Sequence, residues 1–274
     1  MNKKYYSPAK INLFFRVLNK RLDGYHDIFS VLQAVNIFDV LQMEAKEEDL
    51  FICTDPSIAN SNNLVLKALK VFRRETGIED PLSIHLEKHI PMEGGLGGGS
   101  SNAATMLWAL NEFFATSIPI DTLMMWGGSL GSDVPFFFSK GRAICLGRGE
   151  IVKDILPIKK KFSFWIAKPD FGVSTKEVYE KFDDLDILPG QINQLEQSAF
   201  AVMPKLAMVK KQLLDNGFRR VVMTGSGSGF YCFGNPQNMH MEGITLYPVE
   251  NIDRPFDQWY QPCSVVNDSA ARVL

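Results

Sequence analysis

The chain has 274 residues, of which 46% are hydrophobic and 22% are charged, so it contains enough apolar material to bury a substantial core. Its 29 basic and 31 acidic side chains leave a formal net charge of −2, which gives no general attraction to nucleic acid or to an anionic membrane. At about 150 residues per domain, this length favours two lobes. Any anion-binding site should therefore be local.

Strands and helices are interspersed along the sequence, which predicts an α+β fold. Strands are expected where apolar runs lack a clean helical period, at residues 11–18, 82–88, 161–167 and 219–223. Helices are expected at residues 63–77, from about residue 100 onward, and at about residues 194–216 with a kink or break at Pro204. The lysine-rich segment 153–161, which carries Pro157, is the expected crossing between an N-terminal lobe (1–152) and a C-terminal lobe (153–274).

The N-terminal segment and the cysteines indicate the compartment. Residues 1–18 have a basic start but no uninterrupted apolar region, and no run of the sequence approaches the about 20 apolar residues that a membrane span requires. Cys53, Cys145, Cys232 and Cys263 are far apart and form no C-x-x-C pair, so reduced thiols are expected. We predict a cytoplasmic protein that binds neither nucleic acid nor a membrane.

The stretch PMEGGLGGGSSNAATMLW (91–108) is the clearest sign of a binding site. Its glycines follow a predicted strand, and a helix of small and apolar residues begins near Ser100 or Ser101. Free backbone amides and the helix dipole make such a helix start a favourable seat for phosphate oxygens. The alternative is a tight turn before a closely packed helix.

Familiar nucleotide motifs do not match this stretch. A P-loop needs Gly-Lys-Ser/Thr, and a dinucleotide fingerprint needs G-x-G-x-x-G, but here the last position is Ser100 or Asn102. The tripeptide Asp170-Phe171-Gly172 matches the protein-kinase DFG, yet the other kinase motifs are missing.

PMEGGLGGGSSNAA (91–104) resembles the phosphate-binding motif of the GHMP kinases, and four further segments fit the same family in order. They are SPAKINLFFRVLNKRLDGYHDI (7–28), LGSDVPFFF (130–138), GVSTKEVY (172–179) and MTGSGSGFYCF (223–233). The resemblance implies a two-lobed GHMP kinase fold with the active site between the lobes, and ATP with Mg²⁺ as cofactors. Segment 7–28 is similar to a branch of the family that phosphorylates the 2-hydroxyl of a cytidine diphosphate substrate in non-mevalonate isoprenoid synthesis.

By this resemblance, Lys10 and Asp133 are the catalytic residues. Asp133 would accept the proton of the substrate alcohol, while Lys10 would keep Asp133 ionised and stabilise charge on the oxygen. The alternatives are a turn residue at Asp133, in Ser-Asp before Val-Pro, and a solvated surface lysine at position 10.

The nucleotide side follows from the same match. The residues expected to bind the nucleotide are Gly94, Gly95, Leu96, Gly97, Gly98, Gly99, Ser100 and Ser101 around the phosphates, with Asn63 and Lys88 near adenine. Asn63 is equally suited to be a helix N-cap. Mg²⁺ should arrive with ATP, where the Ser101 hydroxyl could contact it, and no carboxylate cluster indicates a dedicated protein metal site.

The substrate side rests on Asn12, Tyr25 and His26, which match contacts to cytidine and its ribose. Tyr25 is suited to stacking on the pyrimidine, His26 to reading a base edge, and Tyr179 could close the other face. The alternatives are a strand-edge pair with satisfied polar tips for Tyr25 and His26, and a core aromatic for Tyr179.

Two later features complete the sequence-based interpretation. The glycine stretch 224–229 is expected to join two elements and to brace the first glycine loop, although a plain turn would also explain it. Gln194 stands where the family usually has Asp, which leaves the role of that segment open. Another GHMP activity, of homoserine or mevalonate type, and a catalytically silent nucleotide-binding module remain alternatives, and no oligomeric state is predicted.

Overall fold

The computed structural model describes residues 3–156, 158, 160–255 and 258–261 of the chain. The strands are β1 (Lys3–Lys20), β2 (His26–Ala45), β3 (Leu50–Cys53), β4 (Leu82–Glu87), β5 (Arg142–Gly147), β6 (Ile151–Asp154), β7 (Ser163–Pro169), β8 (Arg220–Met223), β9 (Phe230–Phe233) and β10 (Ile244–Glu250). The helices are α1 (Leu64–Thr76), α2 (Gly98–Phe113), α3 (Ile120–Leu130), α4 (Thr175–Asp183), α5 (Leu195–Val202) and α6 (Lys205–Asp215), with short 3₁₀ turns η1 (Pro56–Ile58) and η2 (Pro135–Phe138).

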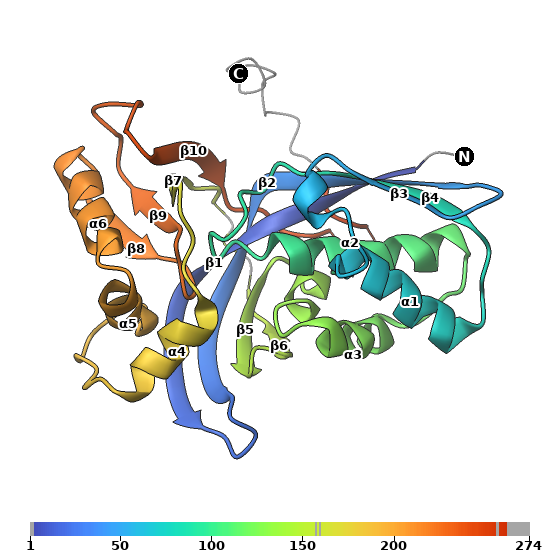
Figure 1. The fold of residues 1–274 in the computed structure, drawn as a ribbon, viewed down its shortest axis with the longest axis horizontal. Coiled ribbons are helices and arrows are strands. Elements are labelled where there is room, and N and C mark those ends of the chain that lie inside the picture. The colour runs from blue at the N-terminus through green and yellow to red at the C-terminus, as the bar shows by residue number, and fades with distance from the viewer. Residues whose placement is uncertain (1–2, 157, 159, 256–257, 262–274) are drawn as a thin grey trace.

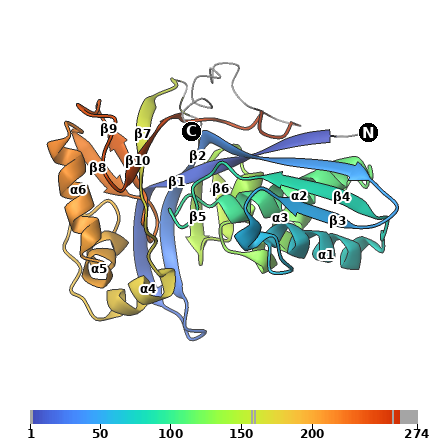
Figure 2. The same ribbon diagram turned by 45° about the horizontal axis from the view of Figure 1, so that its top comes forward.

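The strands form two sheets, which confirms the predicted α+β fold. The first has the order β3-β4-β2-β5-β6, with β1 paired to β2, and the second has the order β10-β7-β9-β8. Figure 1 shows α1, α2 and α3 on one side of the long β1–β2 ribbon, and the second sheet with α4, α5 and α6 on the other. The turned view in Figure 2 keeps this arrangement, so β1 and β2 run between the two groups of helices.

The β1–β2 ribbon is irregular where it carries functional residues. Its antiparallel register shifts between Pro8 and Ala9, between Asn12 and Phe14, and again near Val17. A proline cannot donate a ladder hydrogen bond and is tolerated at such irregularities, which also bend and twist the strand. The ribbon therefore curves from the first group of helices to the second.

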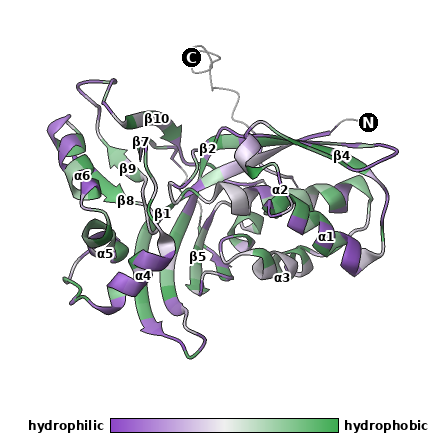
Figure 3. Cartoon of the chain, viewed as in Figure 1, coloured by the Kyte–Doolittle hydropathy of each residue, from purple (hydrophilic) through white to green (hydrophobic). Residues whose placement is uncertain are grey.

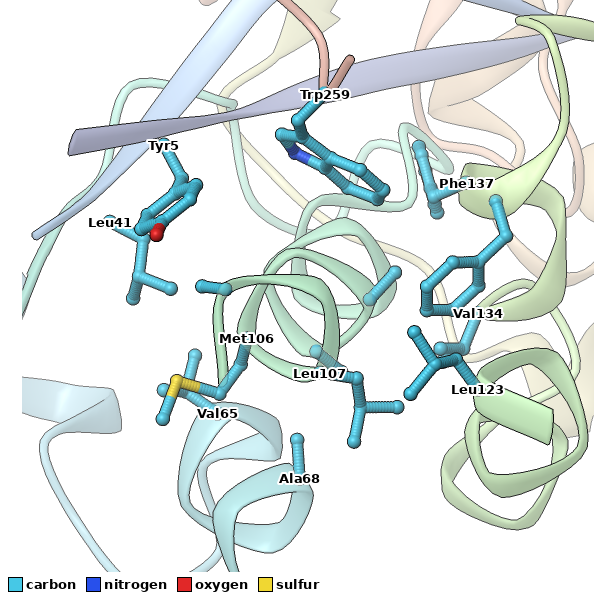
Figure 4. Close-up of a cluster of buried hydrophobic side chains, with 14 of the residues drawn as sticks. Tyr5, Leu41, Val65, Ala68, Met106, Leu107, Leu123, Val134, Phe137 and Trp259 are labelled. Atoms are coloured by element: carbon cyan, nitrogen blue, oxygen red, sulfur yellow. The ribbon is translucent and has the colours of Figure 1, made fainter. Parts of the chain in front are cut away.

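Helix α2 lies at the centre of the larger hydrophobic cluster. Figure 4 shows Met106 and Leu107 of α2 among side chains of α1, α3, β1 and β2, with the indole of Trp259 nearby. The alanines Ala103, Ala104 and Ala109 are fully buried, so α2 packs closely on its neighbours. This packing fixes the N-terminus of α2, where the glycine loop ends. By contrast, α4 is largely hydrophilic in Figure 3 and buries Val178 on its inner side.

Several local predictions are confirmed. The expected helix 194–216 is broken at Pro204, with α5 ending at Val202 and α6 beginning at Lys205. Helix α1 ends at Thr76 and is capped by the expected Gly77, whose φ of 72° is left-handed. Helix α2 begins at Gly98, slightly before the expected Ser100, because the small glycines continue directly into helical geometry.

The cysteines and the helix lengths also bear on the sequence-based expectations. Cys53, Cys145 and Cys232 are free thiols, and burial raises the pKa of Cys145 and of Cys232. Cys263 and Pro157 lie outside the described residues. Among the helices that the structure describes, none is long and apolar enough to cross a membrane.

Candidate active site

Strand β1 places Lys10 and Asn12 on one face, since alternate residues of a strand point the same way. Lys10 Nζ donates to Asn12 Oδ1 at 2.8 Å and lies 3.2 Å from Asp133 Oδ2. The Lys10 side chain is 4% exposed, whereas that of Asp133 is 37% exposed. A buried ammonium thus meets a carboxylate that solvent or a substrate can reach.

Asp133 is held in place by its apolar neighbours. It lies between α3 and η2, and η2 inserts the fully buried Phe136 and Phe137 and the nearly buried Phe138 into the core. The structure brings the two residues predicted to be catalytic together. Lys10 is buried and not a solvated surface lysine, whereas Asp133 lies in a turn, as its alternative also predicted.

The glycine loop ends at an uncapped helix. Gly97, the N-cap of α2, has a φ of 69° and provides no side-chain hydrogen bond, and the first amide bonded back to it is that of Ser101, at 2.9 Å from Gly97 O. The amides of Gly98, Gly99 and Ser100 consequently have no intrahelical acceptor. Together with the helix dipole they form an anion seat.

Close backbone approach explains why this loop is built of glycine. A Cβ on Gly97 would lie 3.0 Å from Lys10 Cγ and 3.1 Å from Phe137 Cζ, and a Cβ on Gly95 would lie 2.3 Å from Thr224 O. Because Gly97 has no Cβ, the Lys10 side chain can lie against the glycine loop. Because Gly95 has none, the loop after β8 can lie directly on the glycine loop.

The loop after β8 braces the first glycine loop, as expected. It joins β8 to β9, and the amides of Ser228 and Gly229 donate to the carbonyls of Glu93 and Gly94, both at 3.2 Å. Asn193 supports the loop from behind by donating to Gly225 O at 2.7 Å.

Gln194, the departure from the family pattern, has a structural partner. Its Oε1 accepts from the Val17 amide at 2.9 Å, and its own amide donates to Phe15 O at 3.1 Å. The segment therefore fastens α5 to the edge of β1.

Two cavities meet at the glycine loop. The larger, of about 880 Å³, contains Lys10, Asp133, Tyr25, His26 and Tyr179 in its wall. The other, of about 550 Å³, extends past the N-terminus of α1 and includes Asn63 and Lys88. Both cavities are lined by Gly95, Gly97 and Ser100. A group seated on the α2 amides would thus lie between the two cavities.

The aromatic residues of the larger cavity are arranged differently from one another. Tyr25 is 57% exposed, and the Arg148 guanidinium lies 5.1 Å from the centre of its ring. The His26 ring is buried and stacks on Tyr179, with centroids 5.1 Å apart and planes at 23°. Burial, with a smaller contribution from the charge of Asp133, raises the pKa of Tyr179. Tyr179 thus both packs against the core and lines the cavity.

Asn12 is buried, and its side chain already has partners. Its amide nitrogen donates to Ser30 Oγ at 2.8 Å, while its oxygen accepts from Lys10 and from Thr224. These bonds aim the Lys10 ammonium.

Asp183, Lys20 and Arg148 also line the larger cavity, and sequence reasoning missed them. Asp183 Oδ1 lies 2.7 Å from His26 Nε2, and its Oδ2 accepts from Lys20 Nζ at 2.6 Å. Desolvation raises the pKa of Asp183, but the hydrogen bonds from Lys20 and His26 outweigh it, so the net pKa is lowered. Asp183 follows Tyr179 by one helical turn on α4, which is the signal that could have pointed to it.

On the nucleotide side, the predicted residues differ in what their side chains do. Asn63 caps α1 by accepting from the Val65 amide at 2.9 Å and also lines the smaller cavity. Lys88 lines that cavity and pairs with the buried Asp39. Leu96 and Ser101 are buried, and Ser101 lines neither cavity. The serine that lines both cavities is Ser100.

Comparison with known protein families gives a match to one family model. The model of the GHMP kinases N terminal domain matches residues 63–141, which span the glycine loop and Asp133. The chain is 43% identical to the 4-diphosphocytidyl-2-C-methyl-D-erythritol kinase of Protochlamydia amoebophila, over 94% of this chain and 92% of that protein. It is 36% identical to the chloroplastic/chromoplastic enzyme of the same name from Solanum lycopersicum, over 93% of this chain and 72% of that protein.

Solved structures share the fold. A crystal structure of 4-(cytidine 5'-diphospho)-2C-methyl-D-erythritol kinase superposes with a TM-score of 0.75 at 28% identity, covering 91% of this chain and 99% of the other. A mevalonate kinase superposes with a TM-score of 0.69 at 13% identity, covering 91% of this chain and 99% of the other, which is a likeness of fold alone.

Proposed function

The chain belongs to the GHMP kinase family and is an ATP-dependent small-molecule kinase, and from this premise we propose that its acceptor is 4-diphosphocytidyl-2-C-methyl-D-erythritol, phosphorylated on the 2-hydroxyl. The relatives that bear this name support the choice of acceptor. The observation that supports the proposed site most directly is the pair of Lys10 and Asp133 in the larger cavity, with Lys10 Nζ 3.2 Å from Asp133 Oδ2. The larger cavity meets the smaller one at the glycine loop.

In the proposed arrangement, ATP occupies the smaller cavity and the acceptor occupies the larger one. The free amides of α2 hold the phosphates at the junction of the cavities. The acceptor hydroxyl attacks the terminal phosphorus, an O–P bond forms, and the bond to the departing ADP breaks. Asp133 takes the hydroxyl proton, and Lys10 stabilises negative charge on the attacking oxygen. Asn12 aims Lys10 rather than reacting itself.

Magnesium would supply charge neutralisation on the ATP phosphates. Among the described residues no group of three His, Cys, Asp or Glu side chains could hold a metal ion, so the phosphates themselves would provide most ligands. Ser100 lines both cavities at the start of α2, so its hydroxyl is the side-chain oxygen best placed to contact a magnesium ion on the phosphates. Ser101, which the motif suggested for this contact, is buried and lines neither cavity.

The aromatic end of the larger cavity would bind the cytidine. Tyr25 offers an exposed ring for stacking, and the Tyr179 ring stacks on that of His26. Stacking of a base on an aromatic ring contributes about 1–3 kcal/mol but does not distinguish bases. Discrimination must therefore come from His26, whose Nε2 is already engaged by Asp183. This leaves Nδ1 and the backbone of His26 to contact the base edge.

Two further expectations belong to this proposal. The division into lobes at residues 152 and 153 stays a proposal, and this boundary falls inside β6, the edge strand of the first sheet. A cytoplasmic location stays a prediction, because the plant relatives are named chloroplastic.

The test is ADP release by the purified protein with the proposed acceptor, with mevalonate and with homoserine. We expect turnover with the cytidine-bearing acceptor, and an Asp133→Asn variant should lose about 100-fold or more in kcat while still binding ADP. Asp121→Asn, on the exposed start of α3, is the matched control and should keep full activity. Turnover with mevalonate or homoserine alone, or ADP binding without transfer to any alcohol, would contradict the proposal.

A further inference from the structure

A fully buried carboxylate that is not part of the catalytic pair lies beside the smaller cavity, which is proposed to hold ATP. Asp39 is on β2 and has no exposed surface. Its Oδ1 accepts from the amides of His89 and Ile90 at 2.7 and 2.8 Å. Its Oδ2 accepts from Asn102 Nδ2 at 2.8 Å and pairs with Lys88 Nζ. Every bond of this group therefore goes to a residue flanking the glycine loop.

Asp39 bonds to both ends of that loop: Oδ1 to the β4 end, and Oδ2 to Lys88 of the β4 end and to Asn102 of α2. His89 and Ile90 form the exit of β4, immediately before Pro91, and Asn102 lies in the second turn of α2. Lys88 closes the ring by donating to Asn102 Oδ1 at 3.0 Å. The intervening segment 91–97 contains Gly94, Gly95 and Gly97, which have no side chains with which to fix its shape. One carboxylate thus holds both of its ends.

The same group controls a positive charge at the donor cavity. A Cβ on Gly98 would lie 3.3 Å from Lys88 Nζ, so the ammonium adjoins the first residue of α2. A cation is unfavourable at a helix N-terminus because the dipole is positive there. Asp39 offsets that cost from the buried side, whereas Lys88 lines the cavity. The pair consequently presents its positive end, together with the α2 amides, to the place proposed for the phosphates.

We propose that Asp39 is a positioning residue of the donor site, which sets the geometry of the glycine loop and aims the Lys88 ammonium at the ATP phosphates. This rests on the proposed placement of ATP in the smaller cavity. Losing the carboxylate removes charge-assisted hydrogen bonds at both ends of the loop, so nucleotide binding should weaken by about tenfold or more.

The experiment measures ADP affinity by calorimetry in the presence of Mg²⁺, together with the KM values for ATP and for the acceptor and the melting temperature. Asp39→Asn should raise the ADP dissociation constant and the KM for ATP about tenfold or more, and leave the KM for the acceptor nearly unchanged. Asp49→Asn is the matched control. Asp49 also accepts from a backbone amide of β4, that of Leu82 at 2.9 Å, and also pairs with a cationic side chain, that of Arg73, but it lies at the other end of β4 from the glycine loop. It should lower the melting temperature without changing either KM.

A second set of variants separates positioning from general destabilisation. Lys88→Met should also weaken ADP binding, and the double variant Asp39→Asn/Lys88→Met should bind ADP no more weakly than the worse single variant, because both belong to one network. If Asp39→Asn does not fold, Asn102→Ala tests the proposal in its place. This variant removes only the bond between Asp39 and α2, and it should still weaken ADP binding.

The outcomes distinguish this inference from the proposed function. If the wild-type protein binds ADP and Asp39→Asn or Asn102→Ala binds it equally well, the inference is wrong while the donor site stands. Multiplicative losses in the double variant would likewise overturn it. If variants with substitutions at Ser100 and Gly98 bind ADP as tightly as the wild-type protein does, the proposed ATP site itself is wrongly placed.

Discussion

Gly97→Ala probes the contact between the glycine loop and Lys10. Two costs follow from the structure. Gly97 has a φ of 69°, and a residue with a Cβ pays about 1 kcal/mol for that conformation. The added Cβ would also lie 3.0 Å from Lys10 Cγ and 3.1 Å from both Lys10 Cε and Phe137 Cζ. Phe137 is packed in the core, so the clash adds about 1–3 kcal/mol or displaces Lys10.

The matched control is Gly77→Ala at the end of α1. Gly77 has a φ of 72°, and a Cβ there would meet nothing within 4 Å, so this variant carries the backbone cost alone. Urea unfolding should show that Gly97→Ala is less stable than Gly77→Ala by about 1–3 kcal/mol.

A coupled assay of ADP release reports the catalytic part. Moving Lys10 away from Asp133 should lower kcat of Gly97→Ala about tenfold or more, while Gly77→Ala keeps wild-type turnover. If Gly97→Ala matched Gly77→Ala in both stability and kcat, Lys10 would not be seated by the loop as the geometry requires.

Three further predictions concern single side chains. Asp183→Asn should raise the KM for the cytidine substrate about tenfold by freeing His26. The pKa of Asp183 is lowered in the folded protein, so the stabilisation by this carboxylate is complete above the ordinary carboxyl pKa of about 4 and is lost as the pH falls through the lowered pKa. The melting temperature of Asp183→Asn should therefore fall less on acidification than that of the wild type. Ser100→Ala should weaken binding of ADP with Mg²⁺ more than binding of metal-free ADP, and equal affinities for the wild type and the variant with Mg²⁺ would exclude this hydroxyl as a ligand. Gln194→Asp should shorten the reach to the Val17 amide and cost about 1 kcal/mol in urea unfolding at unchanged kcat, so a loss of activity would mean that the segment does more than fasten β1.

Much of the local structure could be predicted from the sequence because it is encoded by neighbouring residues. Pro204 breaks the long helix, Asn63 and Gly77 bound α1, and the glycines before Ser100 lead into the uncapped helix α2. The pairing of Lys10 with Asp133 came instead from the family resemblance. Nothing in either local segment indicates the other, and the structure brings them together through the contact between β1 and the glycine loop.

Other parts of the site could not be predicted because they depend on tertiary packing. Asp183 lies 157 positions from His26, and Asp39 lies 49 positions from Lys88. Asp39 stands in an ordinary apolar strand pattern, so its bonds to both ends of the glycine loop become visible only when β2 and β4 are paired. The motif predicts Ser101 among the phosphate contacts, but Ser101 is buried and lines neither cavity, whereas Ser100 lines both.

The most direct measurement is a crystal structure of the protein with a nonhydrolysable ATP analogue and cytidine diphosphate. The terminal phosphorus should lie over the amides of Gly98, Gly99 and Ser100, facing Asp133 and Lys10, with the cytosine among Tyr25, His26 and Tyr179. A terminal phosphate bound away from the α2 amides, or a cytosine outside the larger cavity, would contradict this placement.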